Sequence, residues 1–288
     1  MIQNVAINSP GMVSTPAGKK SRSRPIVLLM LLFAVMIAAP VLAPYDPQGS
    51  TDISLKHSQA PSLAHPFGTD HSDRDVLSRV LKGMQISLGI ASLAVVVTLV
   101  LGTAYGTLSA MLGGWADTFL MRIIDITLSI PRLLILLAIT AFWETLTFPQ
   151  LAFLLGFSGW FDVARVTRGE VAGLLRRDFV LATKAMGVGR ARLAVHHIFP
   201  HLLPILVVMA TLAIGNTIAL EASLMFLGAG MPLSTVSLGT TIQDGAGTLN
   251  SLWTTIFPGA AIVLIVLACN ALGDALRDAF APEQLHVS

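Results

Sequence analysis

Long uninterrupted runs of apolar residues are the feature that most restricts how this chain can fold. Five of them occupy residues 26–43, 86–110, 146–161, 202–220 and 257–272. A weaker run, at residues 123–143, is interrupted by Asp125 and Arg132. A helix needs roughly 20 mostly apolar residues to cross a bilayer, where every backbone polar group must be satisfied internally. We therefore predict an all-α polytopic membrane protein with six transmembrane helices.

Composition agrees with a membrane location. The chain is 54% hydrophobic and 12% charged, and its mean hydropathy is +0.75. Soluble domains carry about 25% charged residues. The single cysteine, Cys269, lies in the last apolar run, has no partner for an internal disulfide and is expected to pack as a small apolar residue.

The distribution of charge predicts an orientation. Four basic residues precede the first run, at positions 19–24, and residues 165–192 hold seven of the 18 basic residues with only two acids. Residues 228–254 contain one acid and no base. By the positive-inside rule the N-terminus and residues 165–192 are cytoplasmic, and six spans return the C-terminus to the same side. Residues 1–24 are expected to be a disordered cytoplasmic N-terminus.

Several polar or small residues within the runs are candidates for packing or for function. Arg122 and Asp125 share a helix face and are predicted to pair, either as a structural ion pair or beside a partner or transport path. Glu221, near the outer end of the fifth span, is either a transport-path residue or a group bonded to nearby loops. Gly102 and Gly106 predict close approach of two helices or general packing. Residues 222–239 are interpreted as the end of the fifth span running into a loop.

A charged segment at residues 176–200 interrupts the apolar pattern. Asp178 is predicted to cap a helix over residues 179–186, and Gly187 is predicted to end it. Phe179, Ala182, Thr183 and Met186 fall on one face of that helix. A helix this short is unstable alone, so its apolar face with a cationic rim fits a groove in a cytoplasmic partner. The alternatives are a loop without a partner and a basic patch on anionic lipid.

The stretch "FVLATKAMGVGRARLAVHHIFPHLLP" resembles the EAA loop of binding-protein-dependent ABC importers, with matches at Ala182, Gly187 and Pro200. Four further blocks occur in the family order: "HPFGTDHSDRDVLSRVLKGMQISL", "GGWADTFLMRIIDITLSIP", "EASLMFLGAGMP" and "FPGAAIVLIVLACNALGDALRDAFAP". Together they cover residues 65–282. The chain is identified as a member of the dipeptide, oligopeptide and nickel importer family, and resembles its second permease subunit.

This resemblance implies a type I permease fold with a cytoplasmic coupling helix. The first transmembrane helix and a periplasmic segment would occupy residues 25–85, and the permease domain residues 86–282, with the EAA-like loop at 170–200 and a tail at 283–288. The implied partners are a second permease, two ATP-binding subunits and an external solute-binding protein, in a bacterial inner membrane and without nucleic acid. ATP and magnesium would bind the partner ATPases, and this chain would bind no cofactor. The implied ATPase-contacting residues are Asp178, Phe179, Ala182, Thr183, Lys184, Ala185, Met186, Gly187 and Pro200.

The chain departs from the family pattern at four positions. Leu181 replaces the glutamate of the loop and Thr183 its second alanine, so docking would depend on shape and apolar contact rather than on a salt bridge. Asp73 stands at the position of a usual glycine, and Leu238 at that of a usual aromatic residue.

The expected function is that of the permease subunit of an ATP-driven importer, with di- or oligopeptides as cargo. Nickel and other small solutes are alternatives, as is a metal or amino-acid permease of the same class. The chain has no P-loop, because its nearest stretch, "GMVSTPAGKK", has six residues between its glycines and no following Ser or Thr. A secondary transporter would require inverted repeats and intramembrane ionisable groups, and a membrane enzyme would require a polar catalytic cluster. Neither pattern is evident in the sequence.

Overall fold

The computed structural model describes residues 38, 42–49, 58–232, 234–247 and 251–280, and its regular elements are helices. The first predicted span, at residues 26–43, lies almost entirely outside the described residues, as do the predicted disordered N-terminus and the tail. The helices are α2 (Val76–Leu112), α3 (Gly114–Leu128), α4 (Arg132–Thr140), α5 (Phe148–Leu174), α6 (Asp178–Ala185), α7 (Arg190–Leu193), a π-helical turn (Ala194–Ile198), α8 (Phe199–Phe226), α9 (Leu238–Ala246) and α10 (Trp253–Phe280).

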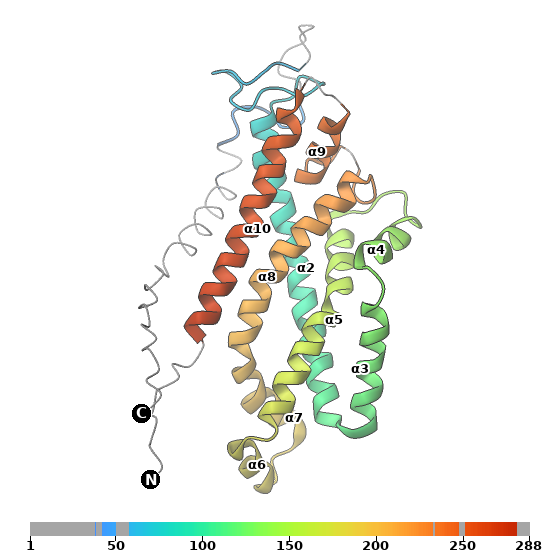
Figure 1. The fold of residues 1–288 in the computed structure, drawn as a ribbon, viewed down its shortest axis with the longest axis vertical. Coiled ribbons are helices and arrows are strands. Elements are labelled where there is room, and N and C mark those ends of the chain that lie inside the picture. The colour runs from blue at the N-terminus through green and yellow to red at the C-terminus, as the bar shows by residue number, and fades with distance from the viewer. Residues whose placement is uncertain (1–37, 39–41, 50–57, 233, 248–250, 281–288) are drawn as a thin grey trace, which may run out of the picture.

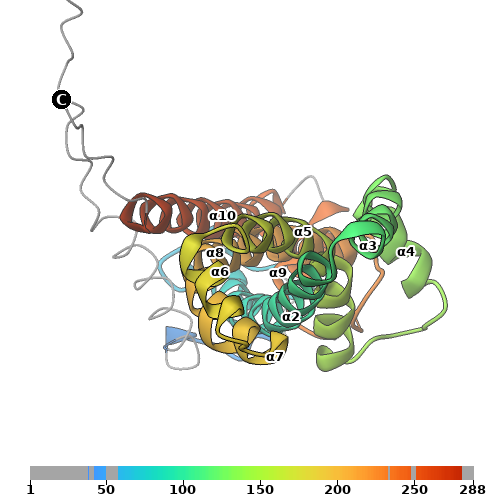
Figure 2. The same cartoon turned by 90° about the horizontal axis from the view of Figure 1, so that it is seen from below.

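The long helices form an elongated bundle with short helices at both ends (Figure 1). α6 and α7 lie at one end, and α9 lies at the opposite end. Figure 2, viewed from below, shows α2 with α5 and α8 beside it and α10 along one flank. The end that carries α6 is called the α6 end below, and the other the α9 end.

Three described helical segments are long and apolar enough to cross a membrane: Val76–Leu112, Arg190–Phe226 and Trp253–Phe280. α3 and α4 bend by 77° against each other and together provide up to one more span. The predicted run at residues 146–161 lies in α5, which is 27 residues long but falls outside this set. Its second half carries four charged residues. The fold is thus nearly all-helical, with several membrane-spanning helices.

Glycines allow α2 and α5 to pack closely, as the spacing of Gly102 and Gly106 predicted. A Cβ added at Gly102 would lie 2.5 Å from the Cβ of Val163, and one at Gly106 would lie 2.4 Å from the carbonyl oxygen of Ala164. On the α5 side, a Cβ at Gly156 would lie 2.5 Å from the carbonyl oxygen of Ala94. Side chains larger than hydrogen would therefore push the two backbones apart.

The region at residues 222–239 is the end of the fifth span followed by a loop, as predicted, except that the loop gives way to a helix at Leu238. α8 continues to Phe226, and a nine-residue helix, α9, follows from Leu238. Ser237 caps α9, because its Oγ accepts a hydrogen bond from the Thr240 N–H at 3.2 Å. The start of α9 lies against α2, where a Cβ at Gly83 would come within 2.9 Å of the Leu238 nitrogen. The sequence reading missed this helix.

Candidate functional site

The charged segment folds at the α6 end much as predicted, with one correction at its start. α6 spans Asp178–Ala185, and the N-cap residue is Arg177, so Asp178 is the first helical residue and not the cap. Its carboxylate still lies in the first turn, where a negative charge is favoured. Gly187 ends the helix as predicted: its φ is +77°, a conformation that favours glycine, and its N–H donates to the Lys184 carbonyl at 3.0 Å.

One face of α6 is buried against the bundle and the other is open. Val180 is 0% exposed, and Thr183 is 6% exposed and donates to the Phe179 carbonyl at 2.7 Å. Phe179 is 40% exposed and Met186 76% exposed. The predicted outer face of Phe179, Ala182, Thr183 and Met186 is therefore wrong at Thr183, which points inward. Leu181 belongs to the open side, with 50% exposure.

Exposed cations lie in and beside α6 and in α7. Arg176, Arg177, Lys184, Arg190 and Arg192 are all exposed. None of the five forms an ion pair within the described part of the chain. The α6 end thus presents exposed apolar side chains together with unpaired positive charge among the described residues.

A shared core fixes α6 to the start of the next long helix. Val180 packs in one buried cluster with Leu193, Ile198 and Leu202. Pro200 lies in the first turn of α8, where its missing N–H costs least, as predicted. The π-helical turn Ala194–Ile198, which the sequence did not reveal, separates α7 from α8.

Arg122 and Asp125 do not pair, contrary to prediction. The carboxylate of Asp125 instead accepts a hydrogen bond from Arg165 of α5 at 2.5 Å, with both side chains half exposed. The spacing of three residues placed Arg122 and Asp125 on one helix, but α5 supplies the nearer cation. Sequence spacing could not reveal a partner 40 residues away.

A second ion pair links the same helices nearer the α6 end. Asp117 of α3 accepts hydrogen bonds from Arg168 of α5, through Nε at 3.0 Å and through a terminal nitrogen, and from Ser109 of α2 at 2.7 Å. α2, α3 and α5 therefore meet at one carboxylate. Neither Asp117 nor Arg168 was singled out in the sequence.

A charged network at the α9 end was also missed. Asp244 of α9 accepts hydrogen bonds from Arg74 at 2.9 Å and from Arg79 at 2.6 Å, and Arg79 is 1% exposed. Arg74 also donates to Asp70 at 2.7 Å. These contacts tie the segment before α2 to α9. They join residues up to 170 positions apart, which no local pattern shows.

Glu221 is fully buried between α2 and α9 rather than open to a path. Ser87 of α2 donates to its Oε2 at 2.8 Å. Ser87 Oγ also lies 3.4 Å from the Leu238 N–H at the start of α9. Glu221 of α8 therefore lies where α8 meets α2 and the start of α9.

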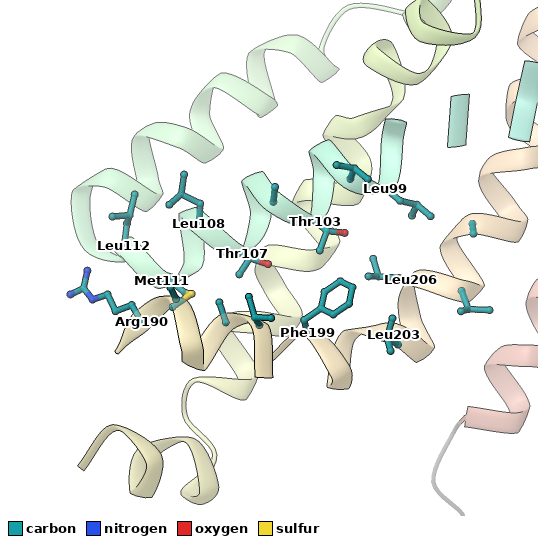
Figure 3. A pocket seen from close by; sticks show the side chains of 17 residues that line it. Leu99, Thr103, Thr107, Leu108, Met111, Leu112, Arg190, Phe199, Leu203 and Leu206 are labelled. Atoms are coloured by element: carbon teal, nitrogen blue, oxygen red, sulfur yellow. The ribbon is translucent and has the colours of Figure 1, made fainter. Parts of the chain in front are cut away.

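An open groove of about 740 Å³ runs between α2 and the α7–α8 segment (Figure 3). Its lining is apolar apart from Thr103 and Thr107 and from Arg190 at one end, as Figure 3 shows. Such a surface suits acyl chains or another apolar helix better than a hydrophilic solute.

Comparison with known proteins decides the class. Residues 102–285 match the family described as "Binding-protein-dependent transport system inner membrane component". The chain belongs to this family. This permease is similar to the "Oligopeptide transport system permease protein OppC" of Bacillus subtilis, with 34% identity over 259 residues that cover 90% of this chain and 84% of that protein.

Two further relatives agree. The permease is 34% identical over 259 residues to the OppC protein of Mycobacterium tuberculosis strain H37Rv, covering 89% of this chain and 88% of that protein. It is 38% identical over 266 residues to a Brucella suis protein that carries the provisional name of peptide permease protein, covering 89% and 85%. The family is the membrane component of its transport systems and not their catalytic subunit.

One departure from the family pattern now has a structural description. Asp73, at the position of the usual glycine, has a φ of +57°. Glycine adopts this left-handed conformation at no steric cost, and aspartate is among the few other residues that tolerate it. The backbone at this turn is therefore compatible with either residue.

Proposed function

We propose that this permease is the membrane-spanning subunit of an ATP-driven importer of di- and oligopeptides. It pairs with a second permease, two ATP-binding subunits and an external solute-binding protein in a bacterial inner membrane. ATP and magnesium bind the ATPase subunits, and this chain contributes six spans with both termini in the cytoplasm. Peptides are proposed as the cargo because its relatives are named as peptide and oligopeptide permeases.

The observation that carries the proposal is the open face of α6. Its apolar side chains are exposed, with exposed cations in and near the same helix, and eight residues make a helix too short to be stable without packing. A groove with an apolar floor and an acidic rim in an ATPase subunit complements this surface. Leu181 faces outward where the family pattern has glutamate, so apolar contact replaces a charge there.

The mechanism follows from the attachment of α6 to α8. Closure of the ATPase subunits on ATP moves α6, and the shared core around Val180 and Ile198 carries the movement to the long helices. The bundle then alternates between outward and inward states. ATP shifts this equilibrium because the two states differ in their ATPase contacts.

Purification of a tagged complex in mild detergent tests the proposal. We expect a second permease and two ATPase subunits to co-elute, with ATP hydrolysis in the eluate and ATP-dependent uptake of a labelled tripeptide after reconstitution. A chain that elutes alone, under conditions that preserve related complexes, would contradict the assignment of partners. Uptake of nickel in place of peptide would overturn the cargo alone.

Two variants test the docking surface. Ala182 is exposed, so Ala182→Arg inserts normally but blocks an apolar groove. Gly187→Pro cannot keep a φ of +77°, because proline is fixed near −65°. Both variants are expected to abolish uptake. Thr118→Arg, on the exposed surface of α3, is the matched control and is expected to transport normally.

A further inference from the structure

His201, near the start of α8, touches α6 and the π-helical turn with one side chain. Its ring stacks on Phe179 of α6, with centroids 5.0 Å apart and planes inclined by 22°. Its Nδ1 atom lies 2.7 Å from the carbonyl oxygen of His197. Because a carbonyl oxygen only accepts hydrogen bonds, Nδ1 carries a proton in this contact. His201 therefore connects the open edge of α6 to the backbone that leads into α8.

The backbone at this point departs from regular α-helical hydrogen bonding. The N–H of Phe199 donates to the carbonyl of Ala194, five residues back instead of four, which is the hydrogen bond of a π-helix. Pro200 and Pro204 have no N–H, so neither can make the α-helical bond to the carbonyl four residues earlier. Helices bend at such breaks. The bond from His201 to His197 supports the backbone inside this deformable segment.

α6 is held to the start of α8 at two places. Val180 anchors its inner side in the core with Ile198 and Leu202. Contact at that side alone would leave α6 free to rotate about the anchor. The stack of Phe179 on His201 lies at the exposed edge and supplies a second point of attachment. Two separated contacts fix the orientation of α6 relative to α8.

We propose that His201 is a positioning residue that transmits movement of α6 to α8. This inference rests on the proposed function, in which α6 binds an ATPase subunit. Without His201, α6 remains docked and ATP is still hydrolysed, but the π-helical turn absorbs the movement. The expected defect is loss of coupling between hydrolysis and transport, with an intact complex.

The test uses the full transporter in proteoliposomes with its binding protein, and measures tripeptide uptake per ATP hydrolysed. For His201→Ala we expect this ratio to fall about tenfold, within the range of typical coupling between sites. His201→Phe keeps the ring contact and loses the donor, and His201→Asn keeps a donor and loses the ring, so both should give intermediate ratios. His196→Ala, at an exposed neighbour in the same turn, is the matched control and should resemble the wild type.

A second measurement needs no cargo. Spin labels at Gly189, in the exposed segment that follows α6, and at Ala219 in α8, in a Cys269→Ala background, report the distance between the α6 end and α8. Trapping the complex with magnesium, ATP and vanadate should leave a narrow distance distribution in the His196→Ala control and a broadened one in His201→Ala.

These outcomes distinguish failure of the proposed role of His201 from failure of the proposed function. A normal uptake ratio and a narrow distribution in His201→Ala, with ATPase subunits bound, would refute the role of His201 and leave the proposed function standing. Absence of ATPase subunits from the wild-type complex would refute the proposed function itself. If His201→Ala fails to insert, His201→Phe and His201→Asn decide together: unchanged ratios in both would refute a role for the bond to His197 and for the ring stack on Phe179, and lowered ratios would support the proposal.

Discussion

Replacing Gly106 with alanine should force α2 and α5 apart. The new Cβ would lie 2.4 Å from the Ala164 carbonyl oxygen and 2.9 Å from the Arg168 nitrogen, and neither backbone atom can rotate away. Overpacking of a core costs about 1–3 kcal/mol, whereas the better helix propensity of alanine returns at most about 1 kcal/mol. Because a 2.4 Å approach to backbone lies at the severe end of that range, the expected net loss in the free energy of unfolding is about 2 kcal/mol.

The assay is thermal unfolding of the purified permease in detergent. A loss of this size lowers the apparent Tm by about 2–6 °C. Gly169→Ala is the matched control, since it lies inside α5 and a Cβ there meets nothing within 4 Å. It should raise the Tm slightly or leave it unchanged. If Gly106→Ala behaved like Gly169→Ala, close packing of α2 on α5 would be refuted.

Two further stability predictions follow from the ion pairs. Arg168→Met removes both hydrogen bonds to the largely buried carboxylate of Asp117 and should lower the free energy of unfolding by about 1–2 kcal/mol. Arg165→Met breaks a half-exposed ion pair and should lower it by less than about 1 kcal/mol. Equal melting shifts for the two would contradict this ranking. Asp244→Ala leaves Arg79 buried beside Arg74 without its closest carboxylate, and should lower the free energy of unfolding by about 3 kcal/mol, which is measured as a lower Tm. Asp278→Ala, on the exposed side of α10, is the control and should change the Tm little. An unchanged Tm for Asp244→Ala would show that the network at the α9 end contributes nothing to stability.

Local chemistry was readable from the sequence. α6 and its glycine stop were predicted within one residue at each end. Asp75 caps α2 by the same kind of local contact, because its carboxylate accepts from the Ser78 N–H at 2.8 Å. Caps and glycine stops depend on neighbours within four residues, so residue spacing alone predicts them.

Contacts between distant segments were not readable in the same way. Arg122 and Asp125 satisfied a helix-spacing rule, yet α5 brought Arg165 to the carboxylate instead. α9 was hidden because glycines and threonines in its sequence resemble a loop, and its stability comes from packing on α2 and α8. Thr183 is buried because its side of α6 packs against the bundle. Helical periodicity does not show which side of a helix makes that tertiary contact.

Contact between α6 and an ATPase subunit is the central claim, and site-specific photo-crosslinking tests it most directly. A photoreactive phenylalanine analogue at Met186, which is 76% exposed on α6, is compared with the same analogue at Phe142, which is 87% exposed beyond α4. The account predicts that Met186 forms an adduct with an ATP-hydrolysing subunit in intact cells and that Phe142 does not. An adduct from Phe142, or none from Met186 in a complex that still contains the ATPase subunits, would contradict the account.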